Sequence, residues 1–167
     1  MKKSLLLLLT IMFFGLFTYA QGPIGKGEKQ LNAGVGFSGW GIPLYIGGDY
    51  GVHEDITVGL ELSYRSYNEN LASTNYHSSI LGFAGNGNYH FNRLLEIPKN
   101  FDFYAGLNIG FYVWNSSADY PGTGTSGLGL GAQVGGRYYL NDKLSLNLEF
   151  GGGNATTGGK FGVTFKF

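Results

Sequence analysis

In the stretch FDFYAGLNIGFYVW, residues 101–114, an apolar residue stands at every second position. Its odd-numbered positions are all apolar, from Phe101 to Val113, and its even-numbered positions include Asp102 and Asn108. A strict period of two is the pattern of a β-strand with one apolar and one polar face. The same period recurs along most of the chain and predicts an all-β fold.

Eight segments share this alternation and are separated by polar or glycine-rich connections. None of them carries Asp, Glu, Lys, Arg or His in its apolar phase. No sustained helical period interrupts them. We therefore expect strands at residues 30–38, 44–52, 56–67, 79–91, 101–114, 127–140, 144–152 and 157–167.

The polar phase indicates which face lies inside. A soluble barrel or sandwich would turn its apolar phase inward and cover its water-facing positions with Lys, Glu, Asp and Thr. Here those positions are mostly Gly and Asn with few charges, which suits the narrow interior of a barrel of eight strands. Turning the apolar phase to lipid and closing the sheet would satisfy the backbone in a bilayer. The expected fold is an eight-stranded antiparallel up-and-down transmembrane β-barrel.

The first 20 residues have the layout of a secretory signal peptide. Lys2 and Lys3 give a positive start, an apolar run follows, and the small residues Thr18 and Ala20 precede the expected cleavage site. A membrane anchor is the alternative, but the run is short for a spanning helix. We expect residues 1–20 to be removed and residues 21–167 to form the barrel domain.

Composition excludes several classes of function. Lys and Arg together number 11, as do Asp and Glu, so no basic face for nucleic acid is expected. The absence of Cys removes disulfides, thiolate metal sites and cysteine nucleophiles. His53, His77 and His90 fall in a turn, at a loop edge and at a lumen position, so neither a metal site nor a cofactor is expected.

The connections alternate in length, as expected for a barrel with short periplasmic turns and longer outer loops. Residues 53–55 and 141–143 are short, whereas residues 68–78 and 115–126 are longer and polar. Residues 92–100 form a long connection on the short side, where Pro98 prevents a strand from continuing. Aromatic residues in or beside the outer loops are candidates for binding a surface ligand or host protein, with headgroup anchoring as the alternative: Trp40, Tyr76, Trp114 and Tyr120.

The stretch KFGVTFKF, residues 160–167, ends on Phe at the carboxyl terminus. Its pattern, carried by Gly162, Phe165 and Phe167, resembles the β-signal by which the barrel assembly machinery recognises its substrates. With the signal peptide and the alternating segments, residues 21–167 as a whole resemble the small eight-stranded OmpA/OmpX-like family. This resemblance implies insertion into the outer membrane of a Gram-negative cell, in contact with outer-membrane lipid.

Ionisable strand residues all lie in the polar phase, with acids and bases in balance. Counting from the turn at 141–143 sets Arg137 one diagonal step from Glu149. Counting from the loop at 153–156 sets Glu149 opposite Lys160. We expect a lumen ion cluster made of Glu61, Arg65, Arg137, Glu149 and Lys160, with independent solvated charges as the alternative. A balanced lining favours a closed lumen over a selectivity ring of one sign.

The expected function is that of a non-enzymatic integral outer-membrane barrel with a structural or surface-interaction role through its outer loops. Resemblance of the cluster to the gating charges of the OmpA-type barrel leaves a narrow gated pore as an alternative. A lipid-modifying outer-membrane enzyme is a further alternative, because His77 and Ser79 resemble the His-x-Ser of lipid A deacylases. No Asp or Glu follows His77 in that strand to orient the imidazole.

Overall fold

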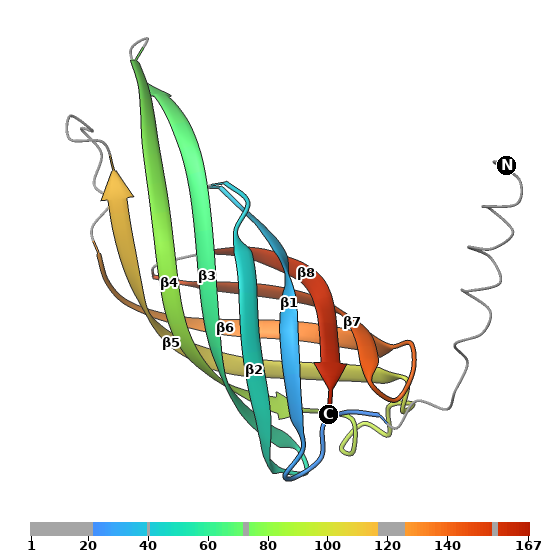
Figure 1. Ribbon diagram of the computed structural model, residues 1–167. Coiled ribbons are helices and arrows are strands. Elements are labelled where there is room, and N and C mark those ends of the chain that lie inside the picture. The colour runs from blue at the N-terminus through green and yellow to red at the C-terminus, as the bar shows by residue number, and fades with distance from the viewer. Residues whose placement is uncertain (1–21, 40, 72–73, 117–125, 155–156) are drawn as a thin grey trace, which may run out of the picture.

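The computed structural model describes residues 22–39, 41–71, 74–116, 126–154 and 157–167. These residues form a closed barrel in which each strand pairs antiparallel with the next and the last pairs with the first (Figure 1). The prediction of an all-β, eight-stranded, antiparallel up-and-down barrel is confirmed. Its strands are β1 (Lys29–Ser38), β2 (Leu44–His53), β3 (Ile56–Leu71), β4 (Thr74–His90), β5 (Phe101–Ser116), β6 (Gly127–Tyr139), β7 (Leu144–Gly153) and β8 (Thr157–Lys166).

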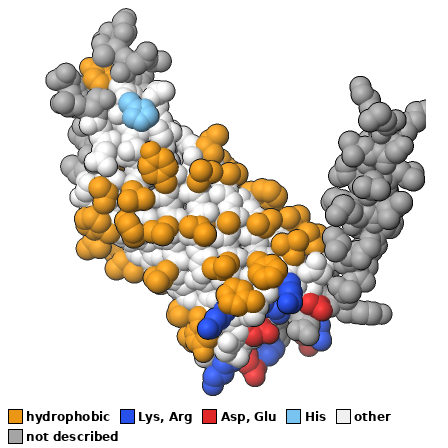
Figure 2. Space-filling view, in the orientation of Figure 1, with side chains coloured by type: hydrophobic (Ala, Val, Ile, Leu, Met, Phe, Trp, Pro, Cys, Tyr) orange, Lys and Arg blue, Asp and Glu red, His pale blue; other side chains and the backbone are white. Residues whose placement is uncertain are grey.

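The apolar phase faces outward and the polar phase faces the lumen. Leu60 and Leu107 are 74% and 71% exposed, whereas Asp102 and Arg137 are 0% and 4% exposed. Hydrophobic side chains cover the body of the barrel, and charged side chains gather at its lower end (Figure 2). This arrangement inverts that of a soluble protein and matches an apolar band that faces lipid.

The predicted outer loop at residues 68–78 is largely a pair of strands, so that prediction was wrong. The hairpin of β3 and β4 continues through Asn68 opposite His77 and ends at Leu71 opposite Thr74. It rises above the neighbouring strands (Figure 1). The alternation of apolar residues fades above Tyr64, because a strand that has left the bilayer needs no apolar face toward lipid. The sequence pattern therefore underestimated the length of the hairpin.

The lower end of the barrel carries the short turns. The connection at residues 91–100 lies on this side, because Arg93 pairs with Glu54 and Asp55 of the β2–β3 turn. Its backbone is irregular but hydrogen-bonded, with Leu95 N donating to Phe91 O and Phe101 N to Pro98 O, both at 2.9 Å. This long connection on the short side is thus fastened to its neighbour by ion pairs.

A segment ahead of β1, residues 22–28, lies against the lower end of the strands. Gly27 N donates to Gly51 O at 2.8 Å, and Gly51 N donates to Glu28 O at 3.0 Å. Lys166 Nζ reaches Gly22 O at 3.3 Å and Glu28 Oε2 at 3.5 Å. Ile24 is 1% exposed, so the segment places an apolar side chain under the polar lumen.

Candidate functional site

The lower ion layer of the lumen, defined here as Arg137, Asp49 and Asp102, is centred on one guanidinium. Nη1 of Arg137 lies 3.0 Å from Asp102 Oδ2, and Nη2 lies 3.1 Å from Asp49 Oδ2. The three side chains are at most 3% exposed. Asp102 stands opposite Arg137 in the β5–β6 register, and Asp49 reaches across from β2. This layer therefore ties opposite walls of the barrel together.

Further polar side chains contact the two lower carboxylates. Gln30 Nε2 and Asn32 Nδ2 both donate to Asp49 Oδ2, at 2.7 and 2.8 Å. His90 Nδ1 lies 2.7 Å from Asp102 Oδ1. A buried ion pair contributes to stability only when its remaining hydrogen-bonding capacity is satisfied, and these donors fill most of it.

The upper ion layer, defined as Lys160, Glu61 and Glu149, lies nearer the outer end. Lys160 Nζ is 2.7 Å from Glu61 Oε2 and 2.6 Å from Glu149 Oε1. Glu149 stands opposite Lys160 in the β7–β8 register, and Glu61 reaches in from β3. These side chains are 13–25% exposed, so this layer is wetter than the lower one.

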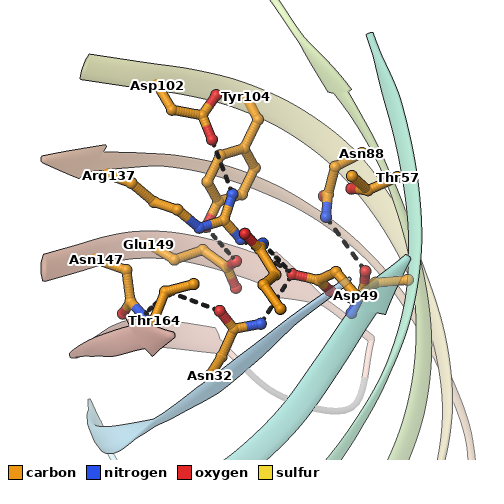
Figure 3. A network of polar contacts seen from close by, with 12 residues as sticks. Asn32, Asp49, Thr57, Asn88, Asp102, Tyr104, Arg137, Asn147, Glu149 and Thr164 are labelled. Atoms are coloured by element: carbon orange, nitrogen blue, oxygen red, sulfur yellow. Dashed lines mark hydrogen bonds and ion pairs between the residues drawn. The ribbon is translucent and has the colours of Figure 1, made fainter. Parts of the chain in front are cut away.

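Tyrosine and amide side chains connect the two layers (Figure 3). Tyr104 donates from its hydroxyl to Glu149 Oε2 at 2.9 Å, while the Arg137 guanidinium lies 4.4 Å from the centre of its ring. A second path starts at Tyr45, whose ring centre lies 5.2 Å from Lys160 Nζ and whose hydroxyl donates to Asn147 Oδ1 at 2.7 Å. It continues from Asn147 through Thr164 to Asn32, with hydrogen bonds of 2.9 and 2.7 Å. Asn32 also donates to Asp49, so the two layers belong to one continuous network.

The five residues of the predicted lumen cluster fall into three places. Lys160 contacts Glu149, which stands opposite it in the β7–β8 register as counted, and also contacts Glu61 on β3. Arg137 stands opposite Asn147 as counted, but its ion pairs are with Asp49 and Asp102 rather than with Glu149. The Arg137 side chain reaches Asp102, the residue directly opposite on β5. Arg65 forms no ion pair with a residue of either layer and lines the cavity above the upper one.

Sequence reasoning missed one buried chain of contacts, Asp102–His90–Thr57. His90 Nε2 lies 3.0 Å from Thr57 Oγ1, so a carboxylate, an imidazole and a hydroxyl stand in the order of a nucleophilic triad. Thr57 and Asp102 are 0% exposed and His90 is 2% exposed, so no substrate reaches this hydroxyl in the closed barrel. The chain acts as a structural brace; its sequence signal is only that all three residues fall in the polar phase.

The histidine of the His-x-Ser pair on β4 contacts neighbouring polar side chains. His77 Nε2 lies 3.3 Å from Ser66 Oγ, and Nδ1 lies 2.8 Å from Asn68 Oδ1. Both partners come from β3, the strand paired with β4. Within the described part of the chain, no three His, Asp or Glu residues are grouped so as to hold a metal ion.

Two of the four aromatic contact candidates, Trp40 and Tyr120, lie outside the described residues. Tyr76 belongs to β4, which begins earlier than predicted, and Trp114 lies in β5, within the predicted strand at 101–114. The backbone N–H of Trp114 donates to Ser126 Oγ at 2.9 Å.

The predicted assembly signal forms the closing strand. Phe165 and Phe167 point outward, 46% and 60% exposed, with ring centres 6.5 Å apart. Gly162 faces the lumen, where a Cβ atom would come within 2.2 Å of Ala33 O on β1. The glycine therefore lets β8 close on β1, and the two Phe rings remain available to lipid or to another protein.

Two voids lie along the lumen. A cavity of about 90 Å³ lies above the upper ion layer, with Lys160 and Glu149 in its lining and Arg65 and Ser38 toward the outside. A smaller void of about 20 Å³ lies between the layers, bordered by Arg137 and Lys160. The upper layer thus separates two small pockets of the same bore.

Comparison with known proteins identifies the architecture. OprG of Pseudomonas aeruginosa superposes with a TM-score of 0.69 at 12% identity, over 89% of this chain and 99% of that one. The N-terminal barrel of OprF from the same organism gives 0.58 at 17% identity, over 86% and 100%. The chain has the fold of the small eight-stranded outer-membrane barrels. Ail of Yersinia pestis also matches, with a TM-score of 0.55 at 12% identity over 85% and 99%.

No family model and no curated protein matches the sequence of this outer-membrane barrel. Among the residues that the structure describes, no helix is long and apolar enough to cross a membrane. The outward apolar band and the closed OmpA/OmpX-like fold place the chain in the outer membrane.

Proposed function

We propose that this protein is a non-enzymatic outer-membrane barrel with a closed, ion-paired lumen, and that it acts through the part exposed outside the cell. In this proposal residues 1–20 are a cleaved signal peptide. The barrel assembly machinery recognises the strand that ends with Phe165 and Phe167. The partner outside is a surface ligand or a host protein.

The observation that carries the closed lumen is the pair of ion layers. The lower layer joins β2, β5 and β6, and the upper layer joins β3, β7 and β8, so side chains cross the bore at two levels. Eight strands leave room for side chains and little else. These two levels support the proposal that no continuous water column crosses the lumen.

Planar bilayer recording tests this proposal. We expect purified wild-type barrel to show no sustained conductance under conditions in which a porin control conducts. Steady open-channel current from the wild type would overturn the closed-lumen proposal.

The sheet that rises above the barrel supports a surface role. The pairing of β2 with β3 ends at Leu44 opposite Tyr64, while β3 continues to Leu71. Within the described chain, residues 65–71 of β3 therefore pair with β4 alone. An unpaired strand edge offers backbone donors and acceptors to an added strand. Among the similar structures, Ail is named as an attachment invasion locus protein.

A shortened hairpin tests the surface role. Residues 68–77 are replaced by Asn-Gly, which joins the paired residues Tyr67 and Ser78 through a two-residue turn. Intact and shortened barrels in detergent are used to capture proteins from a host-cell surface fraction. We expect a partner retained by the intact barrel and lost from the shortened one. Equal capture by both would remove the support for this edge.

A narrow gated pore is the second candidate, favoured by the two voids that the upper ion layer separates. If the two ion layers act as a gate, Glu149→Ala in the upper layer and Arg137→Ala in the lower layer raise bilayer conductance above that of the wild type. Conductance unchanged in both variants would leave the lumen as a plug that does not open.

A further inference from the structure

Among the described residues, Arg65 differs from the lumen cations Arg137 and Lys160 in forming no ion pair with a carboxylate. It is 6% exposed, and its Nη1 donates to Ser38 Oγ at 3.0 Å. Among the described side chains no carboxylate forms an ion pair with it, whereas Arg137 and Lys160 each contact two. A buried charge that lacks a counter-ion is costly, so a guanidinium in this position favours an anion.

The guanidinium borders space that a ligand can occupy. Arg65 lines the cavity of about 90 Å³ above the upper ion layer. Its lining includes the backbone of Gly129, Gly151, Gly153 and Gly158, which carry no side chain to fill it. A cavity holds one water when it offers about 10–15 Å³ to water centres, so this one has room for several waters or for one small solute in their place.

The charges around the cavity are unequal along its axis. At the floor Lys160 stands between Glu61 and Glu149, which gives one more negative than positive charge. Toward the outside Arg65 is positive, and the side chains of Ser63 and Tyr112 also line the space. An anionic group is repelled from the floor and attracted to Arg65, while a donor group is attracted to the floor.

We propose that this cavity is a binding site for a small solute that bears an oxyanion, a carboxylate or a phosphate, held by Arg65. The opposite end of the solute carries hydroxyl or ammonium donors that face Glu61 and Glu149. Two oxygens of a carboxylate or a phosphate match the paired N–H donors of a guanidinium, and Ser38 Oγ accepts from only one of these nitrogens, Nη1. This binding site is additional to the proposed closed lumen and compatible with it, because the solute enters from the outside and does not pass through the barrel.

The test uses the full barrel in detergent micelles and follows backbone amide NMR shifts. Glycolate, acetate and inorganic phosphate are each titrated against chloride at matched ionic strength. We expect saturable shifts at amides around the cavity, with glycolate binding more tightly than acetate because of its hydroxyl donor. Phosphate binding more tightly than glycolate would assign the site to phosphorylated solutes.

Two variants and one control locate the effect. Arg65→Gln removes the charge and should weaken binding by about tenfold or more, as expected for the loss of a charge-assisted hydrogen-bonded pair. Ala84→Leu leaves Arg65 in place and fills the cavity, so it should also abolish the shifts. This variant tests the binding site even if Arg65→Gln does not fold. Lys143→Gln removes an exposed charge at the other end and should leave binding unchanged. Wild-type shifts that equal those in chloride, or full binding by both cavity variants, would overturn the proposal.

Discussion

Replacing Arg137 by Ala should destabilise the barrel more than any other single loss of charge. The change leaves Asp49 and Asp102, which are 3% and 0% exposed, without their shared cation. Removing one partner of a buried ion pair costs about 3–5 kcal/mol. Asp49 keeps its amide donors and Asp102 keeps His90, which places the cost inside that range rather than above it.

Urea unfolding in detergent micelles, read by the different gel mobilities of folded and unfolded barrel, measures the loss. With a denaturant slope of about 2 kcal/mol per molar, the midpoint should fall by about 1.5–2.5 M. The matched control is Arg93→Ala. Arg93 also contacts two carboxylates, but Arg93 and Glu54 are each 62% exposed and only Asp55, at 8%, is buried, so the loss of Arg93 should cost clearly less than the loss of Arg137.

A second substitution tests the cause of the Arg137 effect. In the Arg137→Ala background, Asp102→Asn removes one of the stranded charges and should recover part of the lost stability. If Arg137→Ala and Arg93→Ala shift the midpoint equally, or if Asp102→Asn destabilises the Arg137 variant further, the lower layer is not a dry ion pair.

Three further outcomes are expected. Deletion of Phe167 should lower folded protein in cells much more than it lowers refolding into detergent, measured by heat-modifiable gel mobility; normal insertion in cells would contradict a recognition role. Leu60→Arg, in the middle of the apolar band, should cost about 2–4 kcal/mol in bilayer refolding, whereas Leu94→Arg in the 91–100 connection should cost little, and equal costs would argue against the proposed membrane position. Gly135→Val should lower the urea midpoint by at least the equivalent of about 1–3 kcal/mol, because a Cβ there would lie 2.4 Å from the Tyr104 ring; an unchanged midpoint would show that the ring moves aside freely.

The sequence predicts the fold well because a barrel of alternating strands is described by a period of two and by its turns. The short connections fix register, so Arg137 falls opposite Asn147 and Glu149 opposite Lys160, as counted. The β5–β6 connection is long and carries no register information. For that reason the pairing of Asp102 with Arg137 could not be counted.

Contacts across the bore, between strands that are not neighbours, could not be predicted by counting along the sequence. Asp49 and Arg137 are 88 positions apart and lie on strands that are not neighbours in the sheet. Their meeting depends on the shear and diameter of the closed barrel, which no local pattern encodes. For the same reason the sequence did not predict that Arg65 forms no ion pair with the cluster. The alternation shows that a side chain faces the lumen but not where it lies along the barrel axis.

The lumen network also bears on the order of events in folding. Glu61 and Lys160 are 99 positions apart, and their contact, like that of Asp49 with Arg137, exists only when the cylinder is nearly complete. Interactions that form after the rate-limiting step affect mainly the rate at which the native state is lost. We therefore expect the two ion layers to form late in folding. Substitutions that weaken them should shorten the lifetime of the inserted barrel and leave its rate of insertion almost unchanged.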